Sequence, residues 1–232
     1  MELLVLGHKG MLGHMVVKFL KEHYNIHTIS TRWPECKSEI LEFKGDYIIN
    51  CIGAIPQRIN NFDINWYLPI WLDLNVRCRV IHPGTDCEMD DDNYGISKRI
   101  AADYIREHGK QTKSIKTSII GPELNSNASL LEWFLSQEGE VFGYTNALWN
   151  GNTTLEWAKQ CFHLMNNWNL SDNETIISST PISKYNLLRA IKDIFDKDII
   201  INKQDKGTNK CLNGTIHTGT IQKQLIELKK FI

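Results

Sequence analysis

Apolar residues follow two different spacings in the first half of this chain, and the two spacings alternate. Short continuous apolar runs, such as 47–51, are typical of strands buried within a parallel sheet. Between these runs, apolar residues recur at the spacing of one helix face. The expected strands are 2–6, 26–30, 47–51, 79–82 and 114–119. The expected helices are 11–23, 34–43, 63–74 and 94–107.

Strands that alternate with helices predict an α/β fold, because right-handed βαβ units lay successive strands parallel to one another. We therefore expect a Rossmann-like, doubly wound parallel sheet with helices on both faces. Only fourteen residues separate Arg32 from Tyr47, which leaves room for one helix but not for an additional helix and strand. One edge strand of the sheet is therefore expected to be absent.

The pattern changes after Gly121-Pro122, where Asn, Ser and Trp become frequent. Helices are expected at 129–136, 154–166 and 183–195, with irregular stretches between them. This change predicts two parts, a dinucleotide-binding domain over 1–121 and a smaller substrate-binding lobe over 122–232. Crossings of the chain between the two parts are expected.

The composition is typical of a globular protein, with 42% hydrophobic and 23% charged residues. A net charge of -1 gives no electrostatic reason to expect a nucleic acid or a membrane as partner. The six cysteines form no Cys-x-x-Cys pair, so no metal site is predicted and reduced thiols fit the cytoplasm. No apolar run reaches the length of a membrane span. We expect a cytoplasmic protein.

A glycine-rich turn joins the first expected strand to the first expected helix. Gly7, Gly10 and Gly13 have the spacing G-x-x-G-x-x-G, and Met11 and Leu12 open the helix. Glycines in this position let the backbone approach a pyrophosphate, and the helix N-terminus favours an anion. The turn predicts a dinucleotide site, and the alternative is a turn that serves packing alone.

The end of the second expected strand bears on the choice of dinucleotide. The chain reads Thr31-Arg32 there, and no acidic residue occurs between Asn25 and Pro34. An acidic residue at this place holds the ribose 2′-hydroxyl of NADH, whereas an arginine accommodates the 2′-phosphate of NADPH. NADPH is therefore favoured over NADH. The alternative is that Arg32 is a solvated loop residue.

Tyr94 and Lys98 lie four residues apart, so both side chains share one face of the expected helix. A nearby ammonium lowers the pKa of a phenol, which makes Tyr94 a candidate proton donor. Thr85 follows the strand before this helix, and its hydroxyl can orient a carbonyl oxygen. The three residues together predict proton transfer beside a dinucleotide.

This arrangement resembles the extended short-chain dehydrogenase/reductase family, and within it the dTDP-4-dehydrorhamnose reductase branch. The first-half segments that carry the resemblance are 10–13, 49–53, Ile64-Asn65 with Pro69, Thr85-Asp86 and 116–121. The second-half segments are 143–146, 149–155, 181–185 and 211–214, which resemble sugar-nucleotide reductases. The resemblance covers nearly the whole chain.

The resemblance implies a role for each matching residue. Tyr94 would be the acid/base, Lys98 would lower its pKa and hold the nicotinamide ribose, and Thr85 would bind the substrate oxygen. The implied cofactor-binding residues are Gly7, Gly10, Met11, Leu12, Gly13, Thr31, Arg32, Cys51, Ile52, Gly53, Asn65, Tyr94, Lys98, Ser118 and Ile119. The implied substrate-binding residues are Thr85, Asp86, Asn146, Trp149 and Asn150. For Trp149, a position in the hydrophobic core is as well supported as a position in the sugar site.

Three functions are compatible with these residues. The favoured one is reduction of a 4-keto-6-deoxy sugar nucleotide by NADPH for a surface polysaccharide. The alternatives are an epimerase or dehydratase with tightly bound NAD, and a catalytically degenerate nucleotide-binding protein. The last is favoured by the short connection of eight residues between Thr85 and Tyr94, where relatives have a longer loop. A nucleotide sugar is the expected partner, and the resemblance allows a homodimer.

Overall fold

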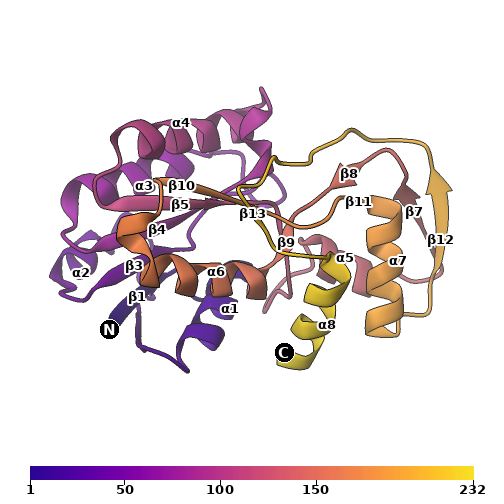
Figure 1. The fold of residues 1–232 in the computed structure, drawn as a ribbon, viewed down its shortest axis with the longest axis horizontal. Coiled ribbons are helices and arrows are strands. Elements are labelled where there is room, and N and C mark those ends of the chain that lie inside the picture. Colours follow the sequence, from indigo (N-terminus) through magenta and orange to yellow (C-terminus); the bar gives the residue numbers. More distant parts are fainter.

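A computed structural model describes all residues from 1 to 232, and it centres on one seven-stranded sheet (Figure 1). The strand order is β13-β10-β5-β4-β3-β1-β2, and every pairing is parallel. The strands are β1 (Glu2–Leu6), β2 (Asn25–Thr28), β3 (Tyr47–Asn50), β4 (Arg79–Gly84), β5 (Thr112–Lys116), β10 (Glu174–Ser178) and β13 (Ile216–His217). The expected α/β architecture with a doubly wound parallel sheet is confirmed.

Helices cover both faces of this sheet, as Figure 1 shows. They are α1 (Met11–Leu20), α2 (Lys37–Glu42), α3 (Ile64–Asn75), α4 (Asn93–His108) and α6 (Thr154–Asn166). Alternate residues of β1 point to opposite faces: Leu3 and Val5 join the core beside α1 and α6, and Leu4 and Leu6 join the core beside α2 and α3. Burial on both faces explains the continuous apolar run of this strand.

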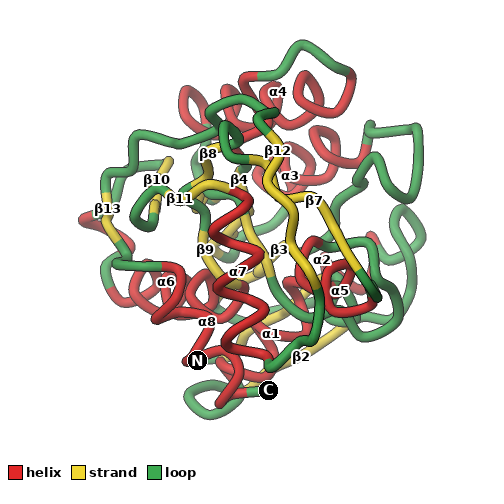
Figure 2. The backbone as a smooth tube through the Cα atoms, turned by 90° about the vertical axis from the view of Figure 1, so that its right-hand side faces the viewer, coloured by secondary structure: helices red, strands yellow, loops and turns green.

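The remaining elements pack at one end of the sheet, in front of it in Figure 2. They are β6 (Ile119–Ile120), α5 (Leu130–Ser136), β7 (Glu140–Tyr144), β8 (Leu148–Trp149), β9 (Asn152–Thr153), β11 (Ile182–Ser183), α7 (Lys184–Phe195), β12 (Ile200–Gln204) and α8 (Ile221–Phe231). Two short 3₁₀ helices lie elsewhere: η1 (Asp86–Met89) packs against α4, and η2 (Trp168–Leu170) against the main sheet. Residues of α5, α7 and α8 form a separate core with β7. The chain returns from this end to the main sheet through β10 and β13. The division at residue 121 stays a prediction.

Several predicted boundaries differ from the structure. The strand expected at 114–119 ends at Lys116, and the chain then pairs Ile119–Ile120 with β9 in a separate sheet. The helix expected at 34–43 begins at Lys37, because residues 34–36 form turns. The sheet ends at β2, in agreement with the short connection from Arg32 to Tyr47.

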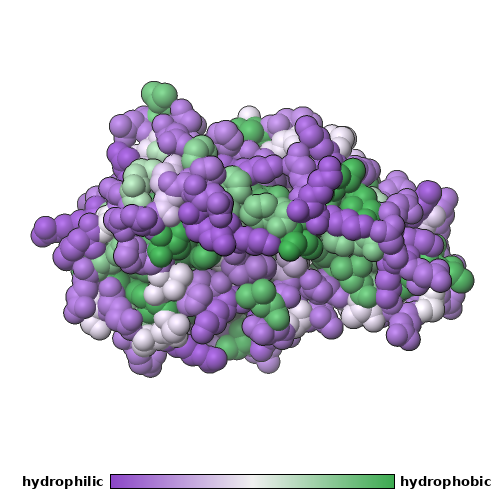
Figure 3. Space-filling view, turned by 90° about the horizontal axis from the view of Figure 1, so that it is seen from below, coloured by the Kyte–Doolittle hydropathy of each residue, from purple (hydrophilic) through white to green (hydrophobic).

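The surface on the side of α1 and α6 is mainly hydrophilic, with separate apolar patches (Figure 3). None of the helices combines the length and the apolar character that a membrane span requires.

Candidate functional site

A cavity of about 490 Å³ lies at the carboxyl edge of the sheet. Its walls follow the ends of β1, β3, β4 and β5 in the chain. Strands β2 and β3 lie on opposite sides of β1, so the strand order reverses there, and ligands of α/β sheets bind at such a point. The predicted residues that line the cavity are Gly10, Met11, Leu12, Cys51, Ile52, Gly53, Asn65, Thr85, Asp86, Tyr94, Lys98, Ser118 and Ile119.

The glycine turn packs closely against β3. Gly7 has a positive φ of 73°, and a Cβ there would lie 2.9 Å from the backbone carbonyl of Cys51. A Cβ on Gly13 would lie 2.2 Å from the carbonyl oxygen of Gly7. These two glycines therefore shape the turn, and Gly10 lines the cavity. No side chain caps the N-terminus of α1, and its first turn holds no acidic residue, so its N–H groups can bind an anion.

Asn65 fixes the loop that follows β3. Its side-chain amide exchanges two hydrogen bonds with the backbone of Ala54, at 2.8 and 3.0 Å, and donates a third to the Ser97 hydroxyl at 3.1 Å. The loop wall of the cavity is thereby tied to α3 and α4. The sequence predicts that Asn65 binds the cofactor. In the structure Asn65 lines the cavity and fixes the backbone of the loop after β3.

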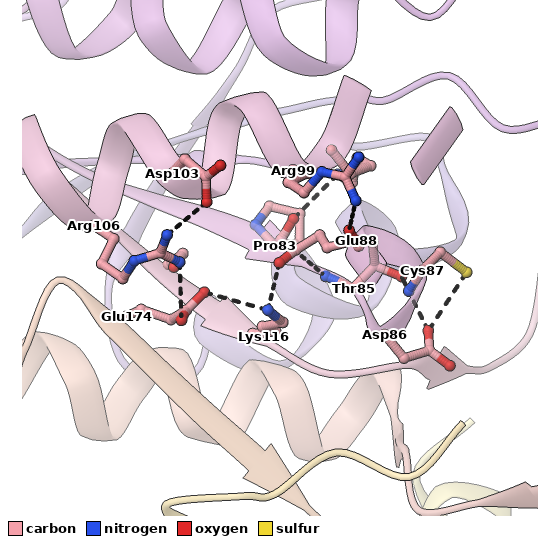
Figure 4. Close-up of polar contacts among 12 residues, drawn as sticks. Pro83, Thr85, Asp86, Cys87, Glu88, Arg99, Asp103, Arg106, Lys116 and Glu174 are labelled. Carbon is pink, nitrogen blue, oxygen red and sulfur yellow. Dashed lines mark hydrogen bonds and ion pairs between the residues drawn. The ribbon is translucent and has the colours of Figure 1, made fainter. Parts of the chain in front are cut away.

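Thr85 caps η1, the short 3₁₀ helix that follows β4. Its hydroxyl accepts a hydrogen bond from the Cys87 N–H, and its own N–H donates to the Glu88 carboxylate at 2.8 Å (Figure 4). These contacts form a capping box, which satisfies donors at the start of the helix. The Thr85 hydroxyl also donates to Asp86 at 3.1 Å.

Tyr94 and Lys98 reach the cavity from the first turns of α4. The Tyr94 ring packs edge-on against Phe62, with centroids 5.6 Å apart, and the Lys98 ammonium donates to the Pro83 carbonyl at 3.2 Å. Burial raises the pKa of Tyr94, and its contact with Thr85 acts in the opposite direction. Burial is thus the largest influence on the Tyr94 pKa, and the role of Lys98 in lowering it stays a prediction.

Besides Gly7 and Gly13, five of the predicted residues do not line the cavity. Thr31 and Arg32 are exposed beyond the end of β2, and Asn146 is exposed near β8. Trp149 is buried in the core that α5, α7 and α8 form with β7, with only 1% of its surface exposed. Asn150 is buried, where it exchanges hydrogen bonds of 2.8 and 2.9 Å with the Leu212 backbone. These contacts give Trp149 and Asn150 structural roles.

Sequence reasoning missed two charged residues of the cavity wall and one behind it. Arg58 and Glu123 line the cavity and form an ion pair, with 2.7 Å between Nη2 and Oε1. Nothing in the sequence places these two residues together, because they belong to separate loops. The sequence did contain a pattern that could have identified Glu88. A threonine followed three residues later by a glutamate, as Thr85 and Glu88 are, is the sequence pattern of a capping box.

No protein-family model matches this chain, and comparison with curated proteins gives no match. Solved structures do match its fold. A dTDP-4-dehydrorhamnose reductase of Clostridium acetobutylicum is similar over 99% of both chains, with 14% identity and a TM-score of 0.77. The enzyme of the same name from Bacillus anthracis, in complex with NADP, covers 100% of this chain and 99% of its own, with 12% identity and a TM-score of 0.77.

A UDP-glucose 4-epimerase of Thermotoga maritima, with UDP-glucose, covers 100% of this chain and 98% of its own, with 16% identity and a TM-score of 0.73. At these identities the likeness concerns the fold. The resemblance stated from the residues is confirmed at that level: the chain has the fold of the short-chain dehydrogenase/reductases that act as sugar-nucleotide reductases and epimerases.

Proposed function

We propose that this protein reduces a 4-keto-6-deoxy sugar nucleotide with NADPH, in the manner of a dTDP-4-dehydrorhamnose reductase. The observation that carries the proposal is the cavity at the switch point of the sheet, which joins the glycine turn to Thr85, Tyr94 and Lys98. Its product would serve a surface polysaccharide, and its place of action would be the cytoplasm. The solved reductases of the same fold support this choice over other oxidoreductases.

The residues present fit a nicotinamide dinucleotide. Gly7 and Gly13 let the turn pack closely, and Gly10 lines the cavity without a side chain. The uncapped N-terminus of α1 suits a pyrophosphate. Arg32, exposed beyond β2, makes no ion pair and is free for a ribose 2′-phosphate. Bound NADPH would supply a hydride for a carbonyl carbon. The structure of a similar fold with NADP supports this cofactor class.

Three side chains would handle the proton and the carbonyl oxygen. Tyr94 is protonated at neutral pH, as a phenol is at its ordinary pKa and as burial reinforces, so it has a proton to donate to the oxygen as negative charge develops. The Lys98 ammonium would stabilise the phenolate that remains. The Thr85 hydroxyl would orient the substrate oxygen by transferring to it the hydrogen bond that it now donates to Asp86, and the capping box holds this residue in place.

The test is NADPH oxidation followed by absorbance, with dTDP-4-keto-6-deoxy-mannose generated in situ. Sugar-dependent oxidation that prefers NADPH over NADH supports the proposal. If dTDP-linked, UDP-linked and GDP-linked keto sugars all fail, the proposal is wrong. Release of NAD from the purified protein would then identify an epimerase or dehydratase. NADPH binding without turnover would identify a degenerate nucleotide-binding protein.

A further inference from the structure

A carboxylate is buried where η1 follows strand β4. The Glu88 side chain is only 3% exposed. Its Oε1 accepts the hydrogen bond from the Thr85 N–H at 2.8 Å, and its Oε2 lies 2.6 Å from the Lys116 ammonium (Figure 4). Both carboxylate oxygens thus have a partner, and one partner is the backbone of a proposed substrate-binding residue.

The backbone leaves space for this carboxylate at Gly84. A Cβ on Gly84 would lie 3.0 Å from Oε1 of Glu88 and 3.0 Å from Cβ of Lys116. Glycine at this position therefore allows the end of β4, the carboxylate and the end of β5 to pack together. The Arg99 guanidinium adds a hydrogen bond of 3.3 Å to the backbone carbonyl of Glu88.

Charged groups of β10 and α4 continue the contact. Lys116 lies 3.7 Å from Glu174, and Glu174 lies 4.0 Å from Arg106, which in turn pairs with Asp103 at 2.6 Å. Figure 4 shows this series from η1 across β5 to α4. Glu88 is the member of the series that contacts Thr85.

The charge of Glu88 also acts on the two other proposed catalytic groups. Burial lowers the pKa of Lys98, and the negative charge of Glu88 opposes that effect. Burial raises the pKa of Tyr94, and Glu88 contributes in the same direction. The carboxylate therefore helps Lys98 to keep its ammonium charge and Tyr94 to keep its proton.

We infer that Glu88 is a positioning residue of this site: it holds the Thr85 backbone and places a buried negative charge beside Gly84 at the end of β4, with Lys116 as its fixed counter-ion. The inference rests on the proposed function, in which Thr85 and the two proposed catalytic groups of α4 act on the substrate. Glu88 itself does not line the cavity, so it acts through them.

The first test compares Glu88→Gln with Glu174→Gln. Both substitutions remove a carboxylate next to Lys116, but only Glu88 contacts Thr85. We expect E88Q to lower kcat about tenfold with NADPH affinity unchanged.

The pH dependence of kcat is the second readout of this comparison. Without the carboxylate, both Lys98 and Tyr94 lose their protons more readily, so the alkaline limb of the plot of kcat against pH moves to lower pH. E174Q is expected to keep the wild-type limb. An equal loss in both variants with an unmoved limb would overturn the inference.

A second measurement separates this inference from the proposed reaction. The double variant Glu88→Met with Lys116→Met replaces the buried pair by apolar side chains of similar length and removes the acceptor for Thr85. We expect the Thr85 amide, followed by nuclear magnetic resonance, to exchange with solvent about tenfold faster. Unchanged exchange in a folded double variant overturns the role of Glu88, whether or not the wild type reduces a keto sugar. Absent turnover in the wild type contradicts the proposed reaction alone.

Discussion

Arg58 and Glu123 are joined by a charge-assisted hydrogen bond of 2.7 Å that connects the loop after β3 to the loop after β6. The Glu123 side chain is 4% exposed and also accepts the backbone N–H groups of Ala128 and Ser129, at 2.7 and 2.8 Å. Both residues of the pair line the cavity. The pair therefore links two walls of the cavity that lie far apart in the sequence.

Removal of the two partners is expected to have unequal effects. Glu123→Ala leaves two part-buried backbone donors without their acceptor. A fully buried donor left so costs about 1–3 kcal/mol of unfolding free energy, which is the upper bound for each of these. Arg58→Ala removes a half-exposed cation, and such pairs contribute about 0–1 kcal/mol. Urea unfolding measures both changes. Equal destabilisation would show that Glu123 does not hold the backbone of its loop.

Acid is expected to weaken the fold through Glu123. Burial opposes ionisation, but hydrogen bonds from Ser129, Ser126 and Ala128 and the charge of Arg58 lower the pKa of Glu123 below its usual 4.5. A lowered folded-state pKa means that the stabilisation is complete above pH 4.5 and disappears as the pH falls through the folded-state value. Urea unfolding between pH 7 and pH 3 should show a shallower acid loss in Glu123→Gln. An acid limb as steep as that of the wild type would contradict this assignment.

Tyr94→Phe is expected to reduce kcat about 100-fold or more, since a positioned proton donor contributes that much to rate. The phenyl ring keeps its edge contact with Phe62, so NADPH binding and unfolding free energy should be unchanged. Tyr104→Phe is the matched control on the same helix, because Tyr104 bonds to Asp73 away from the cavity. A Y94F variant with more than a few per cent of the wild-type rate would exclude Tyr94 as the proton donor.

Arg32→Ala is expected to raise the Kd for NADPH about tenfold and to leave the Kd for NADH unchanged, because a guanidinium pairs with the 2′-phosphate that only NADPH carries. Titration of protein fluorescence with each cofactor gives both constants. Arg189→Ala, an exposed arginine on α7, serves as the control for a general loss of positive charge. Equal changes for NADPH and NADH would place Arg32 away from the 2′-phosphate.

The strands of the first half were predictable because their residues carry their own signal. Residues of β1 and β3 are buried on both faces, and Gly7 interrupts the run where the turn begins. The strand β10 was not predictable in the same way. It begins with Glu174 and Thr175, whose partners are supplied by β5 and by the charge series around Lys116. Only the folded chain shows that the polar start of this strand pairs.

The candidate site, too, could be predicted from the sequence only in part. Gly10, Tyr94 and Lys98 have recognisable spacing, and the structure brings them to one cavity. Asn150 has an ordinary polar side chain, and its role depends on the Leu212 backbone far along the chain. Contacts of that range, and the burial that sets the pKa of Tyr94, arise from tertiary packing and leave no local pattern.

The return of the chain to the sheet through β10 has a consequence for biosynthesis. The partners of β5 at Ser114 and Ile115 are Glu174 and Thr175, which leave the ribosome much later than β5 itself. Until then β5 is an open edge, with unpaired N–H and C=O groups that can join another chain. A nascent chain stalled before residue 174 would therefore expose an unpaired strand edge that can pair with another chain.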